Sequence, residues 1–88
     1  MNPIRIDNIV FIRTVTNFYT GKIVEADEHE IVLEKCAWIA ETERFADTLK
    51  NGTFREVEPY PDGVFVAINR GACVDVCDWN HPLPREQQ

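Results

Sequence analysis

Three cysteines and a histidine carry the strongest metal-binding chemistry in the sequence. Cys73, Cys77 and His81 recur every four residues, and Cys36 could be a fourth ligand. On a helix this spacing would bring the ligands together, but the surrounding residues have a strand pattern. A strand rises about 3.3 Å per residue, so Cys73 and Cys77 would lie roughly 13 Å apart, whereas zinc holds its ligands at about 2.0–2.3 Å. We therefore predict reduced structural thiols and no metal site.

Two arginine-containing turns offer phosphate-binding chemistry. Asn69-Arg70-Gly71 separates two strand patterns, and Arg13-Thr14 ends an earlier one. The planar guanidinium group of arginine can hold a phosphate through two parallel hydrogen bonds. The alternative for Arg70 is an exposed surface arginine or a salt bridge between subunits, and a similar alternative holds for Arg13-Thr14. All five residues are candidate ligand-binding residues.

Aromatic side chains could stack a nucleobase or another planar ligand. Tyr19 and Trp38 are the candidates, and Phe18 and Trp79 are further aromatic residues that could do the same. The alternative is a core role, because so short a chain needs bulky side chains to fill its interior. We expect Trp79 to be the more exposed of these residues, because it lies where the last strand gives way to a polar tail.

The sequence shows no arrangement typical of an enzyme. His29 stands in the acidic segment formed by residues 27–30, without a second imidazole to complete a catalytic or metal site. No Ser/His/Asp order, phosphate-binding glycine loop or Cys/His pair is visible. We predict a non-enzymatic protein that needs no cofactor.

The elements that must position these residues are mainly strands. Apolar and β-branched residues predict strands over residues 8–15, 18–25 and 31–40, with a solvated hairpin loop at 27–30. Residues 9–12 are apolar on both faces, which indicates a strand buried on both sides. Gly21 permits a bend or a close approach of the backbone.

The second half of the chain changes period. Phe45, Ala46 and Leu49 form one face of a short helix over residues 41–51, with Thr42 as N-cap and Gly52 as the stop. We predict an irregular connector over residues 53–63, strands over 64–68 and 73–77, and an irregular tail over 79–88.

Two parts of this pattern resemble the signatures of Sm-like small β-barrels. In the first signature, a glycine is followed two residues on by an apolar residue and six on by aspartate, as in Gly21, Ile23 and Asp27. In the second, an apolar strand leads to Arg-Gly and a further short strand, as around Arg70-Gly71. The resemblance implies a mainly β fold over a single domain, 1–88. It would be a small, strongly bent, five-stranded antiparallel barrel, Sm-like or SH3-like, with one short helix between strands three and four.

The Sm-like resemblance also bears on function. It implies that Arg70 faces a central nucleotide site beside the loop at residues 27–30. The asparagine that reads a base in RNA-binding members is absent, and Asn69 separates Ile68 from Arg70. Direct reading of RNA is therefore disfavoured.

The chain as a whole is similar to a family of small phage and prophage proteins. The shared features are an Arg-Thr pair that ends the first strand, a glycine in the second, a Val-Leu pair in the third, an aromatic residue before a short helix and a glycine that closes the helix. In this chain they are Arg13-Thr14, Gly21, Val32-Leu33, Trp38 and Gly52. This resemblance implies a phage origin and no particular activity.

Length and charge limit the function classes. The 88 residues allow one domain with a small core, which favours a homo-oligomer. The net charge of −6 argues against nucleic-acid binding, which needs a basic surface. The odd cysteine count and the lack of a long apolar run predict a cytoplasmic protein without membrane contact. The phage resemblance implies that this cytoplasm is that of the bacterial host cell.

Three functions fit these limits. The first is a phage protein that binds and sequesters a small nucleotide messenger and so blunts bacterial antiviral defence. The second is an acidic protein-interaction module or inhibitor of a host protein. The third is an Sm-like RNA-binding module, which the charge disfavours.

Overall fold

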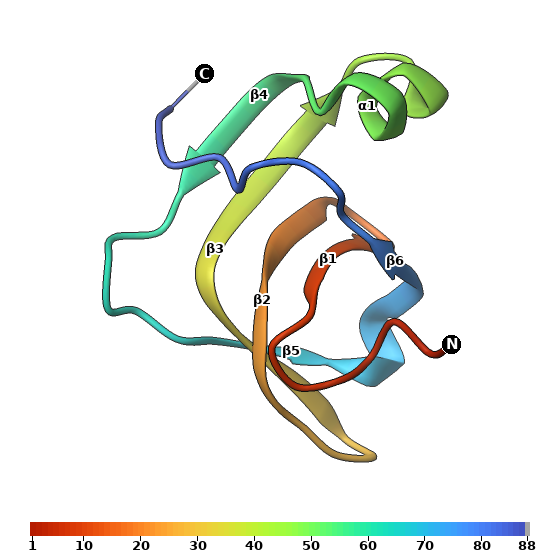
Figure 1. The fold of residues 1–88 in the computed structure, drawn as a ribbon, viewed down its shortest axis with the longest axis vertical. Coiled ribbons are helices and arrows are strands. Elements are labelled where there is room, and N and C mark those ends of the chain that lie inside the picture. Colours follow the sequence, from red (N-terminus) through yellow and green to blue (C-terminus); the bar gives the residue numbers. More distant parts are fainter. Residues whose placement is uncertain (88) are drawn as a thin grey trace.

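Three consecutive antiparallel strands form the centre of the structure, a computed structural model that describes residues 1–87 (Figure 1). They are β1 (Ile9–Thr14), β2 (Phe18–Ala26) and β3 (Glu30–Thr42). The predicted hairpin between β2 and β3 is confirmed. Asp27 closes its loop by accepting hydrogen bonds from the backbone N–H groups of His29 and Glu30, at 2.8 and 2.9 Å.

The remaining strands pair with the two edges of this centre. β4 (Phe54–Pro59) and β5 (Val66–Asn69) pair with β3, and β6 (Cys73–Asp78) pairs with β1. Besides β2, β3 pairs with two further strands: its first residues pair with β5 and its last residues pair with β4. Between these two regions Lys35 has a positive φ of 50°. In the described residues the sheet therefore has six antiparallel strands and is not closed, which differs from the predicted five-stranded barrel.

The extra strand is β4, so the predicted irregular connector over residues 53–63 was wrong for residues 54–59 and is confirmed for residues 60–63. The sequence of β4 lacks the alternation of apolar and polar residues that is typical of a strand. Phe54 and Val57 are buried, and the residues between them and directly after Val57 are charged. Among the described strands β4 pairs only with β3, so its other edge has no partner strand. β5 also begins two residues later than predicted, which leaves Val64 and Phe65 exposed.

The helix α1 (Phe45–Asn51) is shorter than predicted. The expected N-cap, Thr42, is instead the last residue of β3, and Arg44 occupies the N-cap position. The predicted stop is confirmed. Gly52 adopts a left-handed conformation with φ 72°, and its N–H donates to the carbonyl of Thr48 at 2.8 Å.

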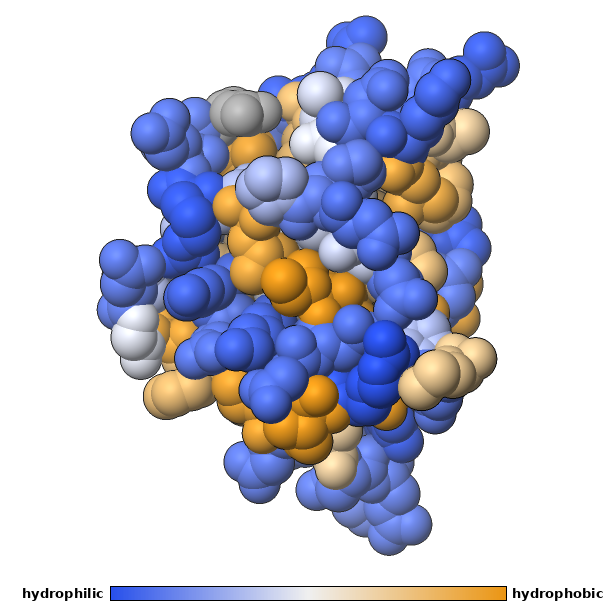
Figure 2. All heavy atoms as spheres, in the orientation of Figure 1, coloured by the Kyte–Doolittle hydropathy of each residue, from blue (hydrophilic) through white to orange (hydrophobic). Residues whose placement is uncertain are grey.

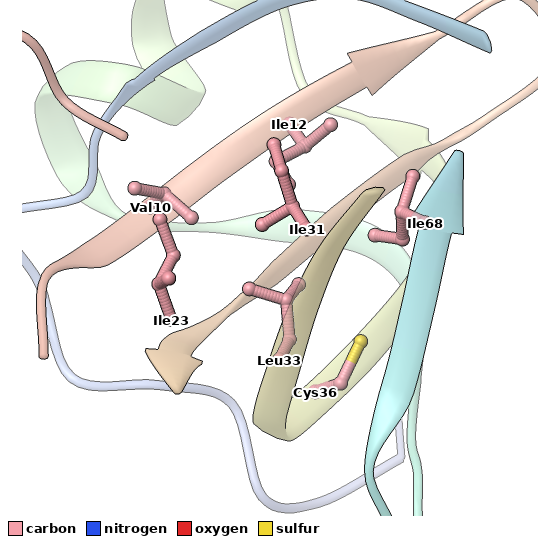
Figure 3. Packing of buried hydrophobic residues seen from close by; sticks show 7 residues of the cluster. All are labelled: Val10, Ile12, Ile23, Ile31, Leu33, Cys36 and Ile68. Carbon is pink, nitrogen blue, oxygen red and sulfur yellow. The ribbon is translucent and has the colours of Figure 1, made fainter. Parts of the chain in front are cut away.

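β1 is buried on both faces, as its apolar residues predict. Val10 and Ile12 face one cluster and Phe11 faces another, and all three are fully buried. Figure 3 shows the first cluster, whose side chains converge from β1, β2, β3 and β5: Val10, Ile12, Ile23, Ile31, Leu33, Cys36 and Ile68. Gly21 belongs to this packing, because a Cβ there would lie 3.0 Å from Leu33, which confirms the predicted close approach.

The second cluster is largely aromatic and centres on Phe11. Its ring lies 5.6 Å from that of Phe18, 5.5 Å from that of Trp79 and 6.3 Å from that of Phe54, measured between centroids. Trp79 is only 3% exposed, so the expectation of an exposed Trp79 was wrong. The sequence places Trp79 beside polar residues, but contacts with Phe11 and Phe54 bury it.

The C-terminal segment packs across the sheet after Trp79. It runs from β6 towards the end of β4, as the blue trace in Figure 1 shows. His81 Nε2 lies 2.7 Å from the carbonyl oxygen of Leu49 in α1, and Arg85 donates to the carbonyl of Tyr60 at 3.1 Å. The tail predicted for residues 79–88 thus has specific contacts, while Gln88 lies outside the described residues.

Candidate functional site

The structure places the seven predicted ligand-binding residues in three separate locations. Asn69, Arg70 and Gly71 lie at the turn between β5 and β6. Arg13 and Thr14 lie at the end of β1. Tyr19 and Trp38 lie opposite each other on β2 and β3 and form the third location.

The turn that holds Arg70 is fixed by backbone contacts. Arg70 begins a short 3-10 helix, η1 (Arg70–Ala72), and its N–H donates to the carbonyl of His29 at 2.9 Å. The Asn69 side chain accepts a hydrogen bond from the Gly71 N–H at 2.7 Å. Asn69 also pairs with Glu30 at the start of β3. The turn therefore lies against the β2–β3 hairpin, as the resemblance implied.

The side chain of Arg70 is half-buried and lacks a partner. Among the described residues its Nε is buried without a hydrogen bond, and no carboxylate forms an ion pair with it. Four other arginines do have carboxylate partners: Arg5, Arg13, Arg55 and Arg85. The charge of Arg70 still acts locally. The pKa of Asp27 is lowered mainly by the backbone N–H groups of Glu30 and His29, and the positive charge of Arg70 adds a smaller effect.

The side chains of Arg13 and Thr14 already have partners within the chain. Arg13 holds Asp75 on β6 through two nitrogens, and its guanidinium lies 5.0 Å from the ring centroid of Phe45. Hydrogen bonding and the charge of Asp75 raise the pKa of Arg13. Thr14 donates to the carbonyl of Asn17 at 2.8 Å and so closes the β1–β2 turn. These contacts join β1 to β6 and α1, which is a structural role.

Trp38 lines an open groove of about 440 Å³, and Tyr19 is its pairing partner on β2. Trp38 lines the groove together with four consecutive residues at the end of β4 and beyond: Glu58, Pro59, Tyr60 and Pro61. Trp38 pairs with Tyr19 on one side and with Glu58 on the other, so these three side chains share a face of the sheet. The groove volume falls in the range of about 300–1,000 Å³ that is typical of small-ligand sites.

Tyr60 and Glu58 are groove residues that the sequence did not identify. The N–H of Tyr60 donates to the carbonyl of Cys36 at 2.8 Å, which holds the segment after β4 against β3. Burial raises the pKa of the Tyr60 phenol, and the proximity of Tyr19 and Cys36 contributes. Only the two prolines beside Tyr60 hinted at a fixed segment, and the pairing of β4 with β3 could not be read from them.

The cysteines do not converge. Cys36 is fully buried on β3, while Cys73 and Cys77 are half-buried on β6, and all three thiols are free. Burial raises the pKa of Cys36 to about 12. His81 faces Leu49 and Trp79 instead. No group of three or more metal-ligating side chains occurs among residues 1–87.

Comparison with models of known protein families and with curated proteins finds no match for this chain. In the part of the chain that the structure describes, every helix is too short and too polar to cross a membrane. The two candidate binding sites are the Arg70 turn and the groove beside Trp38.

Proposed function

We propose that this protein is a non-enzymatic phage protein that binds and sequesters a small nucleotide messenger in the host cytoplasm, blunting antiviral defence. The observation that carries the proposal is the half-buried Arg70, whose Nε has no partner among the described residues. A buried charged group normally has a partner, because its loss of water is otherwise uncompensated. A phosphate of a bound ligand would supply the missing acceptor.

The surroundings of Arg70 favour binding over a structural role. Asn69 and His29 hold the backbone of the turn, so the guanidinium is not needed to fix it. Arginine presents a planar set of donors that matches a phosphate, and a rigid turn reduces the entropy lost on binding.

We also propose an Sm-like or SH3-like kinship for the fold. Support comes from the strand order β6-β1-β2-β3, with β5 on the other edge of β3, and from the short η1 that joins β5 to β6. Among the described strands, β5 pairs only with β3 and β6 only with β1. A homo-oligomer in which a second copy pairs with such an edge would cover it.

The phage origin rests on sequence resemblance, carried by Arg13-Thr14, Gly21, Val32-Leu33, Trp38 and Gly52. The messenger class rests on Arg70 and on the Sm-like resemblance, which implies a nucleotide site at that residue. A thermal-shift screen with linear and cyclic nucleotides, followed by native mass spectrometry, tests the proposal. A ligand at a hundred times its Kd stabilises the folded state by about 2.7 kcal/mol, which is roughly 10 °C or more for a small domain. We expect such a shift with a nucleotide and none with the matched nucleoside. No shift with any nucleotide would contradict the proposal.

The second candidate is an acidic module that binds or inhibits a host protein. The groove beside Trp38 favours it, because the groove is lined by aromatic and proline side chains and by one carboxylate. This function would not require Arg70. This candidate would be favoured if neither the wild type nor the Arg70→Ala variant bound a nucleotide and both retained the same host protein.

A further inference from the structure

The groove beside Trp38 combines an aromatic wall with a carboxylate. Trp38 and Tyr60 supply aromatic rings, and Glu58, directly opposite Trp38 on β4, supplies the carboxylate. Both aromatic side chains are half-buried, whereas Glu58 is exposed. A cation is attracted by the face of an aromatic ring and by a carboxylate, so the two components favour the same kind of ligand.

We propose that this groove binds an arginine or lysine side chain from a basic segment of a partner protein. The aliphatic part of such a side chain would lie on Trp38 and the prolines, and its charged end would reach Glu58. The proposal is independent of the Arg70 site. Arg70 lies beside Asn69, which pairs with Glu30 at the start of β3, whereas Trp38 lies near the end of that strand.

The charges around the groove are complementary to such a partner. Glu56 follows the same face of β4 as Glu58, and it lies directly opposite Glu41 on β3. Like charges that oppose each other across strands are unfavourable. None of these three glutamates has an ion-pair partner among the described residues. A basic segment would neutralise this acidic strip. Figure 2, coloured by hydropathy, shows one face of the molecule on which hydrophobic patches lie among hydrophilic residues.

The chain itself provides an example of a guanidinium at the edge of the groove. Arg85 donates to the carbonyl oxygen of Tyr60 at 3.1 Å and forms an ion pair with Asp62. Arg85 already engages these two acceptors, which leaves Glu58 as the groove carboxylate without an ion-pair partner among the described residues. A nucleotide is a poorer fit, because its phosphate would approach the carboxylate of Glu58.

Titration of the full chain with an oligoarginine peptide tests the proposal. The readout is the pair of tryptophan indole N–H signals in a ¹H–¹⁵N NMR spectrum, assigned with a Trp38→Phe variant. The peptide should shift the Trp38 signal and leave that of Trp79 in place, because Trp79 is only 3% exposed. The same peptide with uncharged citrulline in place of arginine measures how much of the binding depends on charge.

Two variants that each remove one negative charge distinguish a contribution of the groove from a contribution of the net charge. Glu58→Gln should weaken binding of the oligoarginine peptide about tenfold, as expected for a lost charge-assisted hydrogen bond. Glu25→Gln removes the same charge from an exposed residue of β2 that pairs with Val32 and not with the groove. This control should change the affinity by less than about twofold.

Three results would overturn the proposal. They are an equal loss in both variants, equal binding of the citrulline peptide, and a Trp38 signal that moves with a nucleotide but not with oligoarginine. The last result would identify the groove as a planar-ligand site. A shift of Trp38 with oligoarginine that Glu58→Gln weakens and Glu25→Gln leaves unchanged would support it.

Discussion

Gly52, at the end of α1, lies against His81 of the C-terminal segment, and its replacement tests this contact. Its φ of 72° belongs to the left-handed region, which an L-residue enters at a cost of about 1–2 kcal/mol. A Cβ at this position would lie 2.6 Å from Cγ and 2.8 Å from Cβ of His81. Gly52→Ala must therefore also displace His81 and weaken its contact with the Leu49 carbonyl.

Gly63 provides a matched control with the same backbone requirement. Its φ is 83°, but a Cβ there would meet no atom within 4 Å. Gly63→Ala should thus lower the free energy of unfolding by the backbone term alone, about 1–2 kcal/mol. Gly52→Ala adds the cost of overpacking, about 1–3 kcal/mol, for a total of about 2–5 kcal/mol.

Urea denaturation followed by tryptophan fluorescence measures both losses. The double variant Gly52→Ala with His81→Gly removes the blocking atoms and should recover most of the extra loss that Gly52→Ala shows over Gly63→Ala. This comparison is a double-mutant cycle, in which contacting residues are non-additive. Equal losses for Gly52→Ala and Gly63→Ala, or additive effects in the cycle, would refute the packing of the tail on the helix end.

Three further predictions concern the thiols, the hairpin and the assembly. Iodoacetamide at about pH 8 should alkylate Cys73 and Cys77 before Cys36, because burial raises the pKa of Cys36 to about 12; peptide mass spectrometry checks the order, and early labelling of Cys36 would contradict it. Asp27 has a lowered pKa, so its contribution to stability is complete above its ordinary pKa and is lost as pH falls through the lowered value. Asp27→Asn should therefore destabilise the protein at neutral pH, and the difference in melting temperature should vanish in acid; a difference that persists unchanged there would refute this. Sedimentation at micromolar concentration should show a homo-oligomer, and a 10.2 kDa species alone would exclude one.

The strands at the centre of the fold could be predicted because their local pattern and their burial agree. Residues 9–12 are apolar on both faces, and β1 is buried on both faces. β4 could not be predicted in this way. Its charged residues face solvent along an edge, and it is held by pairing with the last part of β3, which no local pattern specifies. Tertiary contact likewise overrides the polar neighbours of Trp79.

The candidate site was predicted less completely than the fold. Residue type identified Arg70 and Trp38, but not whether a partner within the chain already engages each side chain. Asp75 lies 62 residues from Arg13 in the sequence, so their ion pair depends on the register of β1 against β6. The same is true of Tyr60, which joins Trp38 only because β4 pairs with the last part of β3.

The most direct test of the proposed function is nucleotide affinity in Arg70 variants. Titration calorimetry with a nucleotide from the thermal-shift screen should show that Arg70→Ala weakens binding about ten- to a hundredfold, because a charge-assisted hydrogen bond contributes roughly 1.5–3 kcal/mol. Arg70→Lys should restore only part, since a point charge lacks the planar pair of donors. Arg44→Ala, which removes an exposed arginine without a capping hydrogen bond, is the matched control and should bind as the wild type does. Unchanged affinity in Arg70→Ala, with circular dichroism confirming its fold, would contradict the assignment of Arg70 as the phosphate contact.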